Sequence, residues 1–213
     1  MARILITSGP TRQHLDPVRY LTNASSGRMG AALAKAALEQ GHEVVVVSGP
    51  VEVEYPAGAK VVPVVSTEEM LESSRKEFDS CDGMIGAAAP CDYRPLHVEE
   101  GKISKTGSPL LLELIETEDV VATLGAAKGS RWVVGFALET EDHRLRALAK
   151  LERKCCDLIV SNGLEAMESL ENSVEILDST GAVINAFAGS KVRIASQILA
   201  VIQDRLVEAT ADR

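Results

Sequence analysis

The sequence predicts an α/β fold: a Rossmann-like, mostly parallel sheet with helices on both faces and a C-terminal antiparallel hairpin. Three observations lead to this class. Short apolar runs rich in Val and Ile alternate with longer amphipathic stretches along most of the chain. These runs contain few polar residues, as is typical of parallel strands buried on both faces. Near the C-terminus, two runs of alternating apolar and polar residues flank a turn with glycine, which favours a hairpin.

In the first half of the chain, four apolar runs predict strands. The first helix ends at Gly41, because glycine after an amphipathic stretch is a common helix stop. The second helix begins after Ser66, because Glu69 three residues later completes a capping box. The strands are expected at 3–8, 43–48, 60–66 and 83–89, and the helices at 27–40 and 67–78.

In the second half, residues 90–110 contain three prolines and are expected to be irregular. Thr117 is expected to cap the next helix, with Glu118 and Asp119 in a first turn where the helix dipole favours acidic residues. Strands are expected at 110–116, 131–137 and 157–162, hairpin strands at 173–178 and 182–187, and helices at 142–155 and 191–206.

The composition excludes several classes of function. The net charge of −9 disfavours nucleic acid and anionic membranes as partners. The four cysteines and four histidines show no ligand spacing, so neither a disulfide framework nor a metal site is expected. No signal peptide and no apolar run of about 18 residues is visible, so we expect a cytoplasmic protein. Residues 1–213 contain no repeat or linker and are expected to form a single domain.

Residues 8–26 connect the first strand to the first helix, and this loop is much longer than the usual ~2–6 residues. It ends at Ser25, Ser26 and Gly27, where a helix start offers free N–H groups to a phosphate. The alternative is that Ser25 or Ser26 simply caps the helix. Arginines at positions 12, 19 and 28 could add contacts to an anion.

Three further loops at the carboxyl ends of strands are candidates for the same site. The small residues Gly86, Ala87 and Ala88 let a planar ligand approach the backbone, and Asp92 could contact a magnesium-bound phosphate, a sugar or a base, or could be a plain turn residue. Lysines in the irregular segment and on one face of the fourth helix could neutralise phosphate charge, or could simply be solvated. These are Lys102, Lys105, Lys150 and Lys154.

Two other interpretations of this site, a dinucleotide site and a cysteine nucleophile, have less support in the sequence. A dinucleotide site would need a G-x-G-x-x-G turn and a carboxylate after the second strand, and the sequence has neither. Cys91 is a conceivable nucleophile, but no histidine is placed beside it by the sequence. Nucleotide binding without a nicotinamide therefore remains the favoured interpretation.

Five segments, in order and spacing, resemble the phosphopantothenoylcysteine synthetase (phosphopantothenate–cysteine ligase) family: ILITSGPTRQHLDPVRYLTNASSGRMG, GAAAPCDYRP, KISK, VGFALET and DLIVSN. The resemblance implies a Rossmann-like, dimeric enzyme of coenzyme A biosynthesis. In the bacterial branch of that family CTP, with magnesium, activates the carboxylate of 4'-phosphopantothenate as an acyl-cytidylate and releases pyrophosphate. The amine of cysteine then attacks the acyl carbon.

The resemblance also assigns roles to individual residues. It implies that Asn23 faces the acyl-cytidylate and that Lys102, on a flap, serves the second half-reaction. The nucleotide would be bound by Ser25, Ser26, Gly27, Gly86, Ala87, Ala88, Asp92, Lys102, Asp119, Phe136, Lys150 and Lys154.

The chain departs from the family pattern at four positions, namely Ala24, Pro90, Ser104 and Thr117. These departures leave two alternatives open: ATP in place of CTP, and a non-catalytic nucleotide-binding or regulatory relative. Most bacterial members are fused to a flavin-dependent phosphopantothenoylcysteine decarboxylase, so the chain is expected to be either free-standing or one domain of such a protein.

Overall fold

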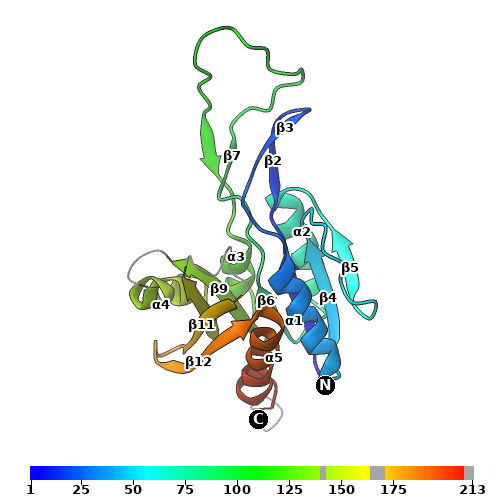
Figure 1. The fold of residues 1–213 in the computed structure, drawn as a ribbon, viewed down its shortest axis with the longest axis vertical. Helices are drawn as coiled ribbons and strands as arrows, with labels where there is room; N and C mark the ends of the chain where they lie inside the picture. Colours follow the sequence, from blue (N-terminus) through cyan, green and yellow to red (C-terminus); the bar gives the residue numbers. More distant parts are fainter. Residues whose placement is uncertain (140–142, 164–170, 209–213) are drawn as a thin grey trace.

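The computed structural model describes residues 1–139, 143–163 and 171–208 (Figure 1). Its centre is an eight-stranded sheet in the order β12-β11-β10-β9-β6-β1-β4-β5. The six strands β10, β9, β6, β1, β4 and β5 run parallel, and β11 and β12 add to the β10 edge in antiparallel pairs. The predicted fold class and the C-terminal hairpin are confirmed. The sheet comprises β1 (Arg3–Ser8), β4 (Glu43–Ser48), β5 (Lys60–Pro63), β6 (Gly83–Gly86), β9 (Trp132–Glu139), β10 (Leu158–Gly163), β11 (Glu171–Asp178) and β12 (Val183–Ser190).

Helices cover both faces of the sheet, because successive side chains of each strand point to opposite sides. From β1, Ile4 and Ile6 pack into one core with α1 and α5, whereas Leu5 packs into the other core with α2, α3 and α4. All three side chains are fully buried. The helices are α1 (Arg28–Glu39), α2 (Thr67–Phe78), α3 (Val120–Ala126), α4 (His143–Arg153) and α5 (Lys191–Ile202), which continues as a π-helical segment over Gln203–Glu208.

Two helix starts test the capping predictions. At α2 the prediction is confirmed, because the Ser66 hydroxyl accepts a hydrogen bond from the Glu69 backbone N–H at 3.1 Å. At α3 the prediction is wrong. Asp119 itself is the N-cap, and its carboxylate accepts the Ala122 N–H at 3.0 Å. Thr117, three residues before the first residue of the helix, instead donates its hydroxyl to the Cys91 carbonyl at 2.6 Å.

The connection from β1 to α1 also differs from its prediction as a long loop. It contains a separate antiparallel hairpin of β2 (Arg12–Asp16) and β3 (Arg19–Thr22). Neither strand shows the apolar alternation that identifies strands in sequence, because little of the hairpin packs on the main core.

A second excursion projects beside this hairpin. β7 (Tyr93–Pro95) pairs with β8 (Leu114–Glu116), and residues 96–113 form a long loop between them. Figure 1 shows this loop and the β2–β3 hairpin extending from the same end of the molecule, away from the eight-stranded sheet. That end carries the carboxyl ends of β1 and β6, where the candidate site residues lie. None of the helices in the described parts of the chain has the length and apolar character needed to cross a membrane.

Candidate functional site

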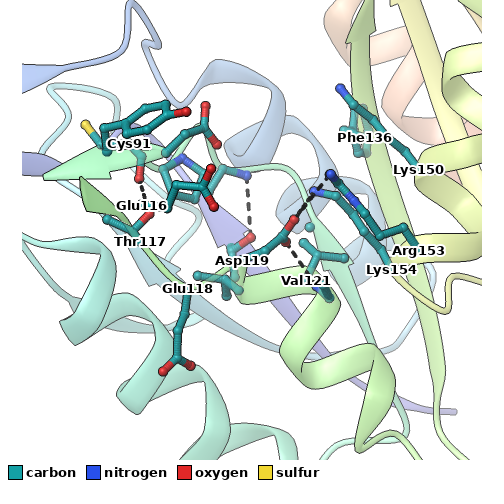
Figure 2. A pocket seen from close by; sticks show the side chains of 18 residues that line it. Cys91, Glu116, Thr117, Glu118, Asp119, Val121, Phe136, Lys150, Arg153 and Lys154 are labelled. Atoms are coloured by element: carbon teal, nitrogen blue, oxygen red, sulfur yellow. Dashed lines mark hydrogen bonds and ion pairs between the residues drawn. The ribbon is translucent and has the colours of Figure 1, made fainter. Parts of the chain in front are cut away.

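A cleft of about 650 Å³ opens at the carboxyl ends of β6 and β9, between α3 and α4 (Figure 2). It brings together residues that are far apart in sequence and were predicted to bind a nucleotide. Its lining includes Gly86, Ala88, Asp92, Asp119, Phe136, Lys150 and Lys154. Ala87 is not among the lining residues; its N–H is donated to the Thr7 carbonyl at 3.1 Å.

Asp119 is the electrostatic centre of the cleft. One of its carboxylate oxygens lies 3.1 Å from the Lys154 ammonium and 3.7 Å from the Arg153 guanidinium, as Figure 2 shows. Burial alone would raise the pKa of Asp119, but the nearby Lys154 charge, the Ala122 N–H and Arg153 outweigh it and lower the pKa. Asp119 thus remains ionised and holds Arg153, the last residue of α4, and Lys154, which follows it, against the N-terminal end of α3.

Arg153 was not predicted from the sequence, although a signal was present. It is three residues after Lys150 and adjacent to Lys154, so all three side chains project toward one side of α4. The cleft wall formed by the C-terminal end of α4 and the residue that follows it therefore carries three positive charges rather than two. Such a wall suits a polyanion, because phosphate oxygens accept charge-assisted hydrogen bonds from lysine and arginine.

Gly86 and Ala88, small residues at the end of β6, line the cleft, and Gly86 also lets α3 pack against the strand. A Cβ at Gly86 would lie 2.4 Å from Cγ2 of Val121, so glycine lets α3 approach the strand. We predicted that Gly86 makes room for a planar ligand; in the structure the missing side chain makes room for α3. The exposed carboxylate of Asp92 lines the cleft from the following loop.

Gly125 of α3 sets the position of Lys154. A Cβ at Gly125 would lie only 2.0 Å from the Lys154 carbonyl oxygen, a backbone atom that can move only with its chain. We expect Gly125→Ala to lower the Tm by about 2–12 °C, as overpacking costs about 1–3 kcal/mol. It should also weaken nucleotide binding several-fold.

Gly58→Ala is the matched control, because a Cβ there would meet only the flexible end of Leu38 at 3.3 Å. Differential scanning fluorimetry with and without CTP measures both effects. An unchanged Tm in Gly125→Ala would show that α3 and α4 separate easily and that Gly125 does not position Lys154.

The turn before α1 lies next to the cleft rather than in its lining. Gly27 is the N-cap, with φ of +72°, and no side chain caps this helix. Simple capping by Ser25 or Ser26 is therefore not what the structure shows. A Cβ at Gly27 would lie 2.9 Å from Val51, and the positive φ would strain any other residue.

Asn23 ties this turn to the cleft. Its side-chain N–H₂ donates to the carbonyl oxygens of Ala89 at 3.2 Å and Pro90 at 2.8 Å. Both acceptors belong to the loop that follows β6, and Pro90 lines the cleft. With both amide hydrogens engaged, the side-chain oxygen of Asn23 is the atom left to face a ligand in this conformation.

Lys102 lies outside the cleft lining, on the projecting loop between β7 and β8, where its side chain is exposed.

Two arginines of the predicted anion cluster have other partners: Arg12 stacks on the Tyr20 ring at 4.5 Å, and Arg19 pairs with Asp16. Arg28 is exposed at the first position of α1. The structure therefore separates the predicted residues into a cleft group, a turn group and a flap lysine.

Asp16 introduces a pH dependence into the β2–β3 hairpin. Burial would raise its pKa, but backbone N–H groups of Val18, Ile103 and Arg19 and the Arg19 guanidinium lower the pKa to about 2. The ionised form stabilises the fold fully above a pH of about 4, and this contribution is lost as the pH falls toward 2. The free energy of unfolding, measured with urea, should therefore be much higher for wild type than for Asp16→Asn at pH 7. The difference should shrink at pH 3. A difference that is the same at both values would contradict this assignment.

Cys91 is not a good nucleophile in this structure. It is buried, its thiol lies 3.4 Å from the Thr11 carbonyl, and burial raises its pKa. Within the described residues, no group of three or more His, Cys, Asp or Glu side chains is arranged to hold a metal ion.

The sequence model of the family described as "DNA/pantothenate metabolism flavoprotein C-terminal domain" (DFP) matches residues 1–206. The chain belongs to this family. The predicted family is thereby confirmed, since relatives of the DFP domain include "Coenzyme A biosynthesis bifunctional protein CoaBC". The protein of that name from Vibrio cholerae is 40% identical over 211 residues, covering 96% of this chain and 53% of the relative. Its namesake from Bacillus subtilis is 43% identical over 164 residues, covering 76% and 40%.

Solved structures place this DFP domain in the same group. The crystal structure of the C-terminal domain of a CoaBC protein is 35% identical, with a TM-score of 0.82, and covers 97% of this chain and 96% of that one. A Cab2 mutant in complex with phosphopantothenate-cysteine shares the fold, with a TM-score of 0.78 at 16% identity, and covers 98% and 88%. The chain spans about half the length of the curated CoaBC relatives that it matches.

Proposed function

We propose that this domain is a phosphopantothenate–cysteine ligase that uses CTP. The observation that carries the proposal is the cleft, in which three cations at the C-terminal end of α4 face the carboxyl ends of β6 and β9. Its relatives named for coenzyme A biosynthesis support the pathway. In the proposed reaction, an oxygen of the 4'-phosphopantothenate carboxylate attacks the α-phosphate of CTP, and pyrophosphate leaves. The amine of cysteine then attacks the acyl carbon, and CMP leaves.

The charges of the cleft suit the first step. Lys150, Arg153 and Lys154 are placed to offset the negative charge of the triphosphate, which otherwise repels an incoming carboxylate. Phe136 offers an apolar surface for the base. Carboxylates of Asp92 and Glu116 line the same cleft and are the hard oxygen donors that magnesium prefers. Magnesium bound with the nucleotide would neutralise further phosphate charge.

The second step depends on residues outside the cleft lining. Asn23 holds the loop after β6 against the turn before α1, and its proposed role is to face the activated acyl group. Lys102 would then approach from the projecting loop. Closure of such a loop keeps water away from the acyl-cytidylate, which hydrolysis would otherwise destroy.

We further propose that the protein is a homodimer that buries its projecting end. Most of the exposed large apolar side chains in the described parts of the chain gather there, on the β2–β3 hairpin and on residues 93–114. They are Val18, Tyr20, Tyr93, Val98, Leu110, Leu111, Leu112 and Leu114. Exposed apolar surface of this extent is typical of a protein contact. Sedimentation equilibrium of wild type and of Leu111→Asp would test the assembly: the wild type should be dimeric and the variant weaker.

A nucleotide panel tests the proposed activity. The protein is incubated with 4'-phosphopantothenate, cysteine, magnesium and each of CTP, ATP, GTP and UTP, and pyrophosphate is measured. CTP should give the fastest release, dependent on all three other components. Binding of CTP without turnover would instead identify a non-catalytic relative, and preference for ATP would correct the nucleotide. Added phosphopantothenoylcysteine decarboxylase should consume the product, and it is also a candidate partner.

A further inference from the structure

The projecting loop is held at one point by the β2–β3 hairpin. Both backbone polar atoms of Ile103 are engaged there: its N–H donates to Asp16 at 3.0 Å, and its carbonyl accepts from the Arg19 guanidinium at 3.0 Å. Four residues earlier, the Glu99 N–H donates to the Leu15 carbonyl at 3.0 Å. The loop therefore has a root at 99–103 that is bonded to the hairpin.

Asp16 is the centre of this attachment. Its side chain is fully buried, although it carries a charge. One oxygen accepts the backbone N–H groups of Val18 and Arg19, both at 2.8 Å, and the other accepts Ile103 and the Arg19 guanidinium. A buried carboxylate with four donors is strongly held, because removing one partner leaves the others unsatisfied.

The rest of the loop has no comparable attachment. Residues 104–112, all of which the structure describes, make a single hydrogen bond, the short-range one from the Ser108 N–H to the Thr106 hydroxyl. These residues are exposed, and Gly107 adopts a positive φ of +80°. The loop thus consists of a fixed root and an exposed tip, and Lys102 immediately precedes the residue at which the root is fixed.

The hairpin that holds the root also leads directly to Asn23, because β3 ends at Thr22. Asn23 is in turn bonded to the loop that lines the cleft. We propose that Asp16 and Arg19 form a clasp, with Asp16 as a positioning residue, that sets the place of Lys102 relative to Asn23. This proposal rests on the proposed ligase function, in which these two residues serve the acyl-cytidylate.

The clasp predicts a selective effect of Asp16→Asn, which keeps the size of the side chain but removes its charge. Hydrogen–deuterium exchange of the 213-residue chain should become at least tenfold faster at 99–105, and change by a smaller factor in β1 and β4. Pyrophosphate release from CTP and 4'-phosphopantothenate should stay within threefold of wild type, while amide formation with cysteine slows at least tenfold. Glu100→Gln, an exposed acid in the same loop, is the matched control and should change neither measurement.

A double-mutant cycle separates positioning from general damage. If Asp16 acts through Lys102, adding Asp16→Asn to Lys102→Gln causes no further loss in the cysteine step; losses that multiply would overturn the proposal. Unchanged exchange at 99–105 would overturn it as well. Should Asp16→Asn fail to fold, Ile103→Pro removes the same hydrogen bond at its donor, because proline has no N–H to donate to Asp16. This variant must give the same exchange and kinetic result. The exchange measurement needs no substrate, so an inactive wild type would defeat the proposed function without deciding the clasp.

Discussion

Asn23→Asp should reduce product formation by about 10²-fold, the usual effect of a misplacement of about 1 Å at a reacting centre. The structure adds a local reason. Asn23 donates to the carbonyl oxygens of Ala89 and Pro90, and an ionised aspartate would direct a negative charge at both acceptors. The turn before α1 would then separate from the loop that follows β6. Pyrophosphate release should be affected less than use of the acyl-cytidylate, so quench-flow should detect accumulated intermediate.

Asn185→Asp on β12 is a suitable control, because it makes the same chemical change in the antiparallel hairpin at one end of the sheet. Its kinetics should match those of wild type. If Asn23→Asp formed product at the wild-type rate, the position of Asn23 between turn and cleft would have no part in the reaction.

Lys154→Gln should weaken CTP binding by about 10–100-fold, since a charge-assisted hydrogen bond contributes about 1.5–3 kcal/mol. The Lys154 ammonium lies in the cleft, 3.1 Å from Asp119, and is only 18% exposed, so solvent screens its charge little. The substitution also leaves the Asp119 carboxylate with less positive charge beside it. Because burial favours the neutral carboxyl, the pKa of Asp119 should rise in the variant.

Lys76→Gln provides the control, because Lys76 also pairs with an acid, Glu72, but on the exposed surface of α2. Titration calorimetry should give the wild-type Kd for that variant. A Kd for CTP that is unchanged in Lys154→Gln would place the triphosphate elsewhere and remove the principal support for the cleft as the nucleotide site.

The main sheet could be predicted because its strands are continuous apolar runs whose neighbours are set by buried registers such as Ile6 with Val46. The β2–β3 hairpin could not. Its stability comes from a buried carboxylate, Asp16, and from backbone hydrogen bonds, neither of which produces a periodic pattern. For a similar reason the start of α3 was misplaced, since Thr117 and Asp119 are both good capping residues and only tertiary contacts choose between them.

The candidate site was predicted in part. Lys150 and Lys154 are one helical turn apart, so their common side of α4 follows from spacing alone, and that side lines the cleft. The packing role of Gly86 was missed, because the contact with Val121 depends on how α3 packs. The place of Lys102 is beyond sequence reasoning, since a long loop can reach many positions. The roles of these residues in a reaction remain predictions.

The most direct test of the central claim is a single-turnover experiment in which cysteine is withheld. With CTP, magnesium and 4'-phosphopantothenate, the account predicts a burst of about one pyrophosphate per active site, a bound acyl-cytidylate, and CMP only after cysteine is added. Pyrophosphate that appears only together with cysteine, or release of a nucleoside diphosphate in place of pyrophosphate, would contradict it.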